Sequence, residues 1–147
     1  MRLGLMGGTF DPIHWGHLIL AEQAREQFGL EKVLFVTAAQ PPHKLGVQVT
    51  EARHRLEMTR LAIADNELFE LSTIEMDRPG PSYTIDTIKQ LLEDYGPGTE
   101  IYLLVGADEA SQLMSWRDPY GIQALATIAV ASRAYAYSTG YDVLVGL

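Results

Sequence analysis

The sequence predicts an α/β fold in which helices cover both faces of a parallel sheet of about five strands. Short apolar or β-branched runs alternate along the chain with longer amphipathic ones. The short runs are continuously apolar rather than alternately polar, which is typical of strands buried on both faces. Ligands of such sheets bind beyond the carboxyl ends of the strands, where the strand order reverses. The residues that follow the strands are therefore the first candidates for function.

The first half of the chain is expected to hold three strands and two helices. The strands cover residues 3–6, 32–37 and 69–74, and the helices cover residues 16–28 and 50–65. Gly29 ends the first helix, because glycine readily adopts the left-handed conformation found there. Thr50 can cap the second helix. The basic residues of that helix (Arg53, His54, Arg55 and Arg60) are expected to form a solvated or packing face.

The second half is expected to hold one long helix, two strands and two short helices. The long helix covers residues 82–95, the strands cover residues 101–105 and 126–132, and the short helices follow Asp108 and Asp118. A strand, helix, strand order throughout makes right-handed crossovers the expected connection.

The length and composition of the chain are typical of one globular domain, and they exclude several classes of function. The chain has 147 residues, of which 47% are hydrophobic and 20% charged. It has no cysteine, which excludes disulfides, thiolate metal sites and cysteine nucleophiles. A formal net charge of −8 disfavours nucleic acid and anionic membranes as partners.

No apolar run reaches the ~20 residues of a membrane span, and no secretory signal is recognisable. We therefore expect a cytoplasmic protein. A homo-oligomer is compatible with the sequence.

The segment after the first strand, GGTFDPIHWGH, is the main candidate site. Gly7 and Gly8 permit a tight turn and a close approach of phosphate to the backbone. The helix that follows directs free N–H groups to the same place. His14 and His17 are three residues apart, which places both rings on one face of that helix. The segment is neither a Walker loop nor a GxGxxG fingerprint, and two surface histidines or a metal site remain alternatives.

This segment resembles the (T/S)xGHxGH-type signature of the nucleotidyltransferase superfamily, in its GGTFDPxHxGH form. From Met1 to about Arg133 the chain is similar to the bacterial nicotinate mononucleotide adenylyltransferases. Four further segments carry the likeness: PPHK at 41–44, RPGPSYTIDT at 78–87, GADE at 106–109 and SWRD at 115–118.

The resemblance implies a Rossmann-like fold and a defined reaction. The phosphate of nicotinate mononucleotide attacks the α-phosphorus of ATP in line, and nicotinate adenine dinucleotide and pyrophosphate leave, a step of NAD biosynthesis. No covalent enzyme intermediate is implied, and Mg²⁺ accompanies the triphosphate, held mainly by phosphate oxygens and water. An enzyme for another acceptor such as phosphopantetheine, or an inactive nucleotide-binding fragment, remains an alternative.

The resemblance also assigns roles to residues. His14 and His17 are the implied catalytic residues. The implied ATP contacts are Gly7, Gly8, Thr9, Phe10, His14, His17, Gly106 and Asp108. The implied nicotinate mononucleotide contacts are Lys44, Tyr83, Thr84, Trp116, Arg117 and Arg133, and no metal-binding side chain is implied.

Several of these residues also have a structural reading. Asp108 can cap the helix after it, and Ser82 or Thr84 can cap the long helix. Trp116 can be a core residue, and Lys44 a solvated loop residue.

One motif of the family does not occur in these residues. The family usually carries an ISSTxxR segment later in its chain, whereas here Ser138 and Thr139 lack the following arginine. Residues 143–145 can begin the family's sixth strand. We therefore expect residues 1–147 to form a single nucleotidyltransferase domain. At its C-terminal side this domain is either truncated, continued beyond these residues, or divergent.

Overall fold

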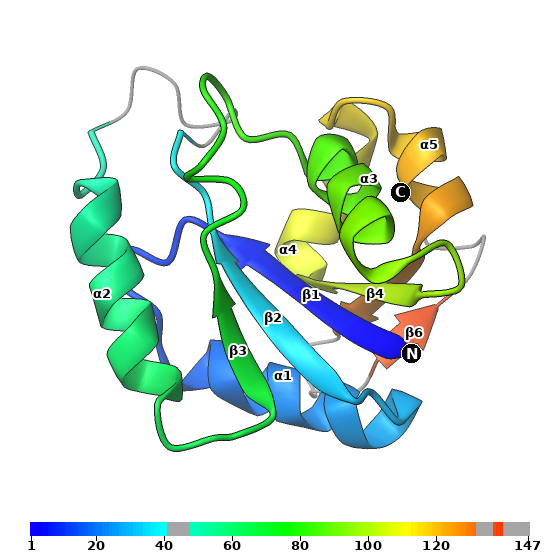
Figure 1. The fold of residues 1–147 in the computed structure, drawn as a ribbon, viewed down its shortest axis with the longest axis horizontal. Helices are drawn as coiled ribbons and strands as arrows, with labels where there is room; N and C mark the ends of the chain where they lie inside the picture. Colours follow the sequence, from blue (N-terminus) through cyan, green and yellow to red (C-terminus); the bar gives the residue numbers. More distant parts are fainter. Residues whose placement is uncertain (41–47, 132–136, 140–147) are drawn as a thin grey trace.

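Six strands in the described part of the chain form one sheet, in the order β3-β2-β1-β4-β5-β6 (Figure 1). In this computed structural model, residues 1–40, 48–131 and 137–139 are described. The strands are β1 (Arg2–Gly8), β2 (Lys32–Thr37), β3 (Phe69–Ser72), β4 (Glu100–Gly106), β5 (Thr127–Ala131) and β6 (Tyr137–Thr139). The helices are α1 (Trp15–Phe28), α2 (Ala52–Ile63), α3 (Thr84–Tyr95), α4 (Ala107–Ala110), the 3₁₀ turn η2 (Leu113–Ser115) and α5 (Pro119–Leu125).

The sheet is parallel from β3 to β5, as the sequence predicts. The chain builds outward from β1 through β2 to β3 and then returns to place β4 on the other side of β1. The strand order therefore reverses between β1 and β4, which is where such sheets bind ligands. The edge strand β6 is antiparallel to β5 and was not predicted. The predicted strand at residues 143–145 lies outside the described residues.

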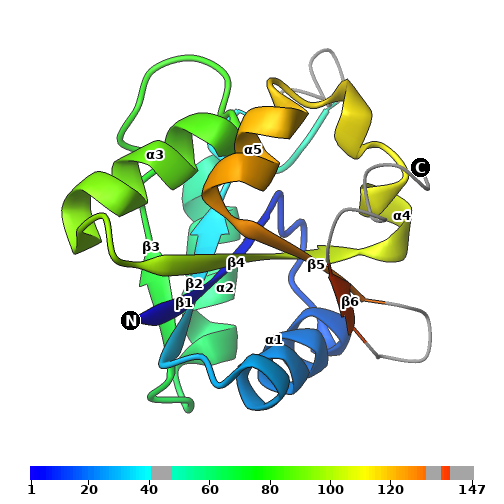
Figure 2. The same cartoon turned by 90° about the vertical axis from the view of Figure 1, so that its right-hand side faces the viewer.

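Helices cover both faces of the sheet (Figure 2). Leu34 and Val36 of β2 belong to the core cluster that also contains buried residues of α3 and α5. Val33 and Phe35 belong to the opposite cluster, with buried residues of α1 and α2. Because successive side chains of a strand point to opposite faces, this double burial explains why the strand sequences are continuously apolar.

The limits of the predicted strands and long helices lie within two residues of the observed ones; for example, the strand predicted at residues 69–74 ends at Ser72 and the helix predicted at residues 82–95 begins at Thr84. β2 has the predicted limits, and Gly29 ends α1 with a left-handed φ of 61°. The prediction that Thr50 caps α2 is wrong, because α2 begins at Ala52 and its N-cap residue Glu51 makes no side-chain capping bond. The N–H of Thr50 instead donates to Oδ2 of Asp11 at 2.9 Å.

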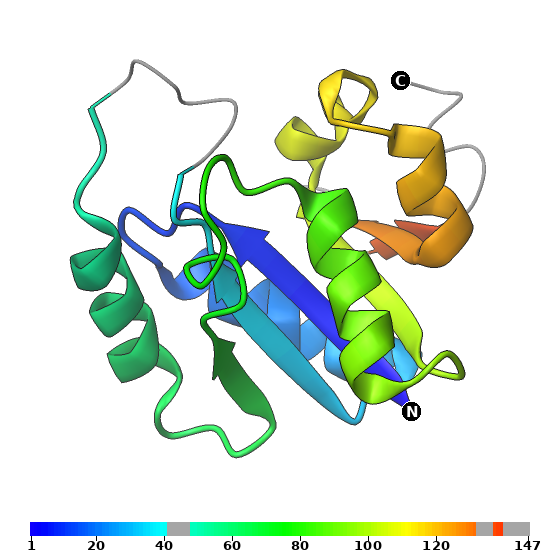
Figure 3. The same ribbon diagram turned by 45° about the horizontal axis from the view of Figure 1, so that its top comes forward.

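The segments that follow the carboxyl ends of β1 and β4 lie at one end of the sheet. Figure 3 shows the β1–α1 loop, α4 and the start of α3 gathered at this end. Within the described part of the chain, no helix has the length and apolar character needed to cross a bilayer.

Candidate functional site

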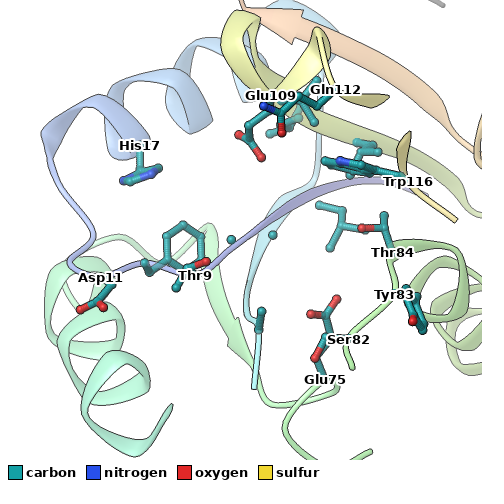
Figure 4. Close-up of a pocket in the computed structure, with 18 of the residues that line it drawn as sticks. Thr9, Asp11, His17, Glu75, Ser82, Tyr83, Thr84, Glu109, Gln112 and Trp116 are labelled. Carbon is teal, nitrogen blue, oxygen red and sulfur yellow. The ribbon is translucent and has the colours of Figure 1, made fainter. Parts of the chain in front are cut away.

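A cavity of about 570 Å³ opens where the strand order reverses. Its lining comes from four places in the sequence: β1 with the turn after it and the start of α1, the residue that follows β2, the segment before α3 with its first residue, and the segment from β4 to Arg117. Figure 4 shows His17 at one side of this cavity and Trp116, with Tyr83 and Thr84, at the other.

His14 and His17 form the two halves of the N-terminal cap of α1. Nδ1 of His14 accepts from the N–H of Gly16 at 3.1 Å, and Nδ1 of His17 accepts from the N–H of His14 at 3.1 Å. The ring centroids lie 4.0 Å apart. Because both Nδ1 atoms accept, each neutral ring carries its proton on Nε2. The pair therefore offers two N–H donors beside a helix N-terminus, an arrangement suited to phosphate oxygens.

His17 is neutral at pH 7 in the free protein. Its partial burial, and to a lesser extent the neighbouring His14, lower its pKa from 6.5 to about 4. The positive end of the α1 dipole acts in the same direction. A bound polyphosphate would act against these effects, because a nearby negative charge favours the imidazolium form.

The turn before the histidines is held in an uncommon conformation. Phe10 has a left-handed φ of 50°, a region that non-glycine residues seldom adopt. Its buried ring packs edge-on against His17, with the centroids 5.1 Å apart and the planes at 88°. A Cβ on Gly8 would lie 3.2 Å from Cε1 of Phe10, and one on Gly16 would lie 2.9 Å from Cε1 of His14. The glycines therefore leave room for both aromatic side chains.

Trp116, Arg117, Tyr83 and Thr84 line the other side of the cavity. Trp116 is partly buried and packs against the core, so it is neither a fully exposed ring nor an interior one. The guanidinium carbon of Arg117 lies 4.0 Å from the centroid of the Tyr83 ring. The prediction that Ser82 or Thr84 caps α3 is wrong, because Tyr83 is the N-cap residue and makes no side-chain capping bond in the described part of the chain.

Two predicted nucleotide contacts lie beside the cavity rather than in its lining, namely Gly106 and Asp108. The prediction that Asp108 caps α4 is wrong, because the helix begins at Ala107 and Gly106 is the N-cap residue. Glu109, which does line the cavity, accepts from the N–H of Gly106 at 3.4 Å. Lys44 and Arg133 lie outside the described residues.

Sequence reasoning missed a buried carboxyl group in the cavity wall. Glu75 is 6% exposed, and burial raises its pKa. The hydroxyl of Thr87 donates to Glu75 at 2.6 Å and accepts from Arg78 at 2.7 Å. Arg78 and Thr87 are the ends of the RPGPSYTIDT segment, but Glu75 comes directly after a predicted strand and gave no separate signal.

It also missed Arg55, whose side chain is buried on α2. Arg55, Thr59 and Ile63 are the buried residues of this helix. Their spacing places them on one face, which was the signal available in the sequence. In the described residues there is no group of three or more side chains suited to hold a metal ion.

Comparison with known proteins identifies relatives across nearly the whole chain. The family model described as cytidylyltransferase-like matches residues 5–144. The probable nicotinate-nucleotide adenylyltransferase of Thermoanaerobacter sp. (strain X514) is 48% identical over 133 residues, covering 90% of this chain and 63% of that protein. A protein of the same name from Thermus thermophilus is 46% identical over 133 residues, covering 90% and 70%. The match to the Moorella thermoacetica relative spans 54% of its length, so the chain corresponds to only part of several relatives.

Solved structures share the fold at low sequence identity. Plasmodium falciparum nicotinic acid mononucleotide adenylyltransferase complexed with NaAD superposes with a TM-score of 0.79 at 20% identity, covering 97% of this chain and 69% of that one. The same enzyme complexed with APC gives a TM-score of 0.76 at 19% identity, with the same coverage.

Proposed function

The chain belongs to the cytidylyltransferase-like family, and from this premise we propose that it transfers AMP from ATP to nicotinate mononucleotide. The products are nicotinate adenine dinucleotide and pyrophosphate, as expected in NAD biosynthesis. Relatives 46% and 48% identical that bear the matching enzyme name support this choice. The observation that carries it is the His14–His17 pair, placed at a helix N-terminus inside the cavity.

The nucleotide half of the proposed site is the turn after β1 together with α1. The triphosphate lies against the glycine turn, and Nε2–H groups of His14 and His17 donate to its oxygens. An oxygen of the acceptor phosphate bonds to the α-phosphorus, and the bond from that phosphorus to the bridging oxygen breaks. Pyrophosphate leaves with the electron pair. Positioning and charge stabilisation supply the catalysis, so no side-chain nucleophile is needed.

The acceptor half of the proposed site is the wall formed by Tyr83, Thr84, Trp116 and Arg117. The pyridine ring stacks on the indole of Trp116, and the free N–H groups at the start of α3 receive the nicotinate carboxylate. Support for this use of the helix end is that, within the described residues, the N-cap residue Tyr83 makes no side-chain capping bond. Lys44 and Arg133 are proposed phosphate contacts on sequence grounds alone.

Magnesium enters the proposed reaction as part of the substrate, MgATP. The cavity wall presents the carboxylates of Asp11, Glu75 and Glu109, and these do not form a three-ligand group. Mg²⁺ readily keeps several waters and takes phosphate oxygens as ligands, so we propose that the triphosphate and water hold it. Gly106 and Asp108 remain proposed contacts of the nucleoside, next to Glu109.

We propose that residues 1–147 act as one nucleotidyltransferase domain in the cytoplasm, with small-molecule substrates as its partners. The absence of cysteine is compatible with a reducing compartment. The net charge of −8 argues against nucleic acid as a partner.

A pyrophosphate-release assay tests the proposed function. The protein is mixed with MgATP and with nicotinate mononucleotide, nicotinamide mononucleotide or phosphopantetheine in turn. We expect the highest kcat/KM with nicotinate mononucleotide. A preference for phosphopantetheine would contradict the proposed acceptor. Calorimetric binding of ATP without pyrophosphate release from any acceptor would assign the chain to nucleotide binding alone.

A further inference from the structure

We propose that Arg55, which lies outside the cavity lining, is a positioning residue for His17. Its buried guanidinium fixes the turn from Thr9 to Asp11, and Phe10 within that turn fixes the imidazole. The consequence for catalysis rests on the proposed function, but the structural claim does not.

The guanidinium of Arg55 joins three segments of the chain. Its side chain is buried, with the residue 1% exposed. Nε donates to the carbonyl of Thr50 at 2.7 Å, and Nη1 donates to the carbonyl of Thr9 at 2.9 Å. The carbonyls of Ala38 and Ala39, which follow β2, accept from Nη1 at 2.6 Å and from Nη2 at 3.1 Å. A planar guanidinium carries its donors in a fixed fork, so these four bonds fix the segments relative to one another.

The same group holds both ends of the turn before the histidines. Thr9 is held directly by the bond to its carbonyl. Asp11 is held through Thr50, because the carbonyl of Thr50 accepts from Arg55 while its N–H donates to Asp11 at 2.9 Å. Burial lowers the pKa of Arg55, and the negative charge of Asp11 opposes this change. Arg55 and Asp11 therefore hold the turn from Thr9 to Asp11 at both ends, through hydrogen bonds and through the attraction between their opposite charges.

Phe10 lies between the two held residues and touches His17. Its φ of 50° is unfavourable for a residue with a side chain, and such a conformation persists only where the surroundings enforce it. The Phe10 ring is 3% exposed and meets the His17 ring edge-on at 5.1 Å. Release of Thr9 and Asp11 would let the backbone at Phe10 relax, and the ring that shields one side of His17 would move with it.

Among the described residues, the other arginines of α2 make no such contacts, and they serve as controls. Arg60 is exposed and pairs with Glu57 on the same helix, and Arg53 is exposed and pairs with Glu51. Neither lines the cavity. Substitution of Arg60 therefore removes the same charge from the same helix without touching the turn.

The test compares Arg55→Lys, Arg55→Met and the control Arg60→Met. Lysine keeps the charge but offers donors at one point only, so it cannot hold three segments. The imidazole resonances of His17 are followed by NMR against pH in the free proteins. We expect a wild-type pKa of about 4, the same value in Arg60→Met, and a shift toward 6.5 in both Arg55 variants. Added methylguanidinium should restore the low value in a third variant, Arg55→Ala.

The same variants are then assayed for adenylyl transfer. We expect kcat to fall roughly 10- to 100-fold in Arg55→Lys, as for a small misplacement of a catalytic group, with KM for ATP changed less. A wild-type His17 titration in Arg55→Lys and Arg55→Met would overturn the proposal. So would an unfolded Arg55→Lys protein, because it would assign Arg55 to the stability of the fold. Wild-type protein that releases no pyrophosphate would contradict the proposed function and leave the NMR result standing.

Discussion

His17 is the side chain to which the proposed function assigns the largest catalytic role. In the free protein it is a neutral donor, because burial and His14 hold its pKa at about 4. In the proposed reaction, the hydrogen bond from its Nε2–H strengthens as charge develops on the transferring phosphate. A contact of this kind contributes more in the transition state than in the ground state.

Replacement of His17 by Ala should therefore lower kcat more than it weakens nucleotide binding. We expect a loss of roughly 10²- to 10³-fold in kcat, the usual effect of removing one donor to a developing charge. Steady-state kinetics with saturating acceptor give both constants. His54→Ala, which removes an exposed histidine of α2, is the control and should be unchanged. Equal losses in kcat and ATP affinity would argue against transition-state stabilisation by this ring.

Trp116 should act on the acceptor alone. Stacking on an aromatic side chain contributes about 1–3 kcal/mol per base, so Trp116→Ala should raise the KM for nicotinate mononucleotide by roughly tenfold or more. The KM for ATP should change little. Tyr120→Ala removes an aromatic ring that is 60% exposed and lies outside the cavity lining, and serves as the control. An unchanged acceptor KM in Trp116→Ala would remove this residue from the site.

At the scale of single elements, the proposed site depends most on the N-terminus of α1. His14 caps the helix through Gly16, and a Cβ at that glycine would lie 2.9 Å from Cε1 of the His14 ring. His14 is exposed, so its ring can turn away rather than distort the backbone.

Gly16→Ala should consequently keep the fold and lose turnover. We expect kcat to fall roughly tenfold or more, since a small displacement of a positioned group is costly. The free energy of unfolding in urea should change by less than about 1 kcal/mol, because alanine is the better helix former. Gly98→Ala, where a Cβ would meet nothing within 4 Å, is the matched control. Wild-type kcat in Gly16→Ala would show that the position of His14 does not matter.

Elements with strong local signals were predictable, and contacts between distant segments were not. The run KVLFVT gave the limits of β2, and Gly29 gave the end of α1, because each depends on neighbours in sequence. The prediction that Thr50 caps α2 was wrong, since the N–H of Thr50 bonds to Asp11, 39 residues away. The role of Arg55 was not predicted, because three of its four carbonyl partners, those of Thr9, Ala38 and Ala39, lie 16 or more residues away in the sequence. The spacing of glycines and histidines in the sequence predicted where the cavity lies. Glu75 and Glu109 become part of its lining only in the folded chain.

At the scale of the whole molecule, the low pKa of His17 links stability to pH. The folded protein binds a proton at His17 only near pH 4, whereas the unfolded chain binds it near pH 6.5. Between these values the unfolded state holds more protons, so the contribution of His17 to stability is complete above pH 6.5 and is lost as the pH falls toward 4. Glu75 acts in the opposite sense, because its raised pKa makes its contribution largest at low pH.

A comparison of wild type with His17→Asn isolates the histidine contribution. The free energy of unfolding is measured in urea at several pH values from 7 to 4. We expect the wild type to lose more stability than His17→Asn over this window. The contribution of Glu75 to the free energy of unfolding cancels in this comparison because both proteins contain it. Parallel curves would mean that His17 titrates normally in the folded protein.

The most direct test of the paired-histidine site is an NMR titration of both imidazoles with MgATP. If the two rings hold the triphosphate, saturation should shift the Nε2 and Cε1 resonances of His14 and His17. It should also raise the pKa of His17 from about 4 toward or above 6.5, because the bound phosphates favour the imidazolium form. Saturating MgATP that leaves both rings and the His17 pKa unchanged would contradict the account.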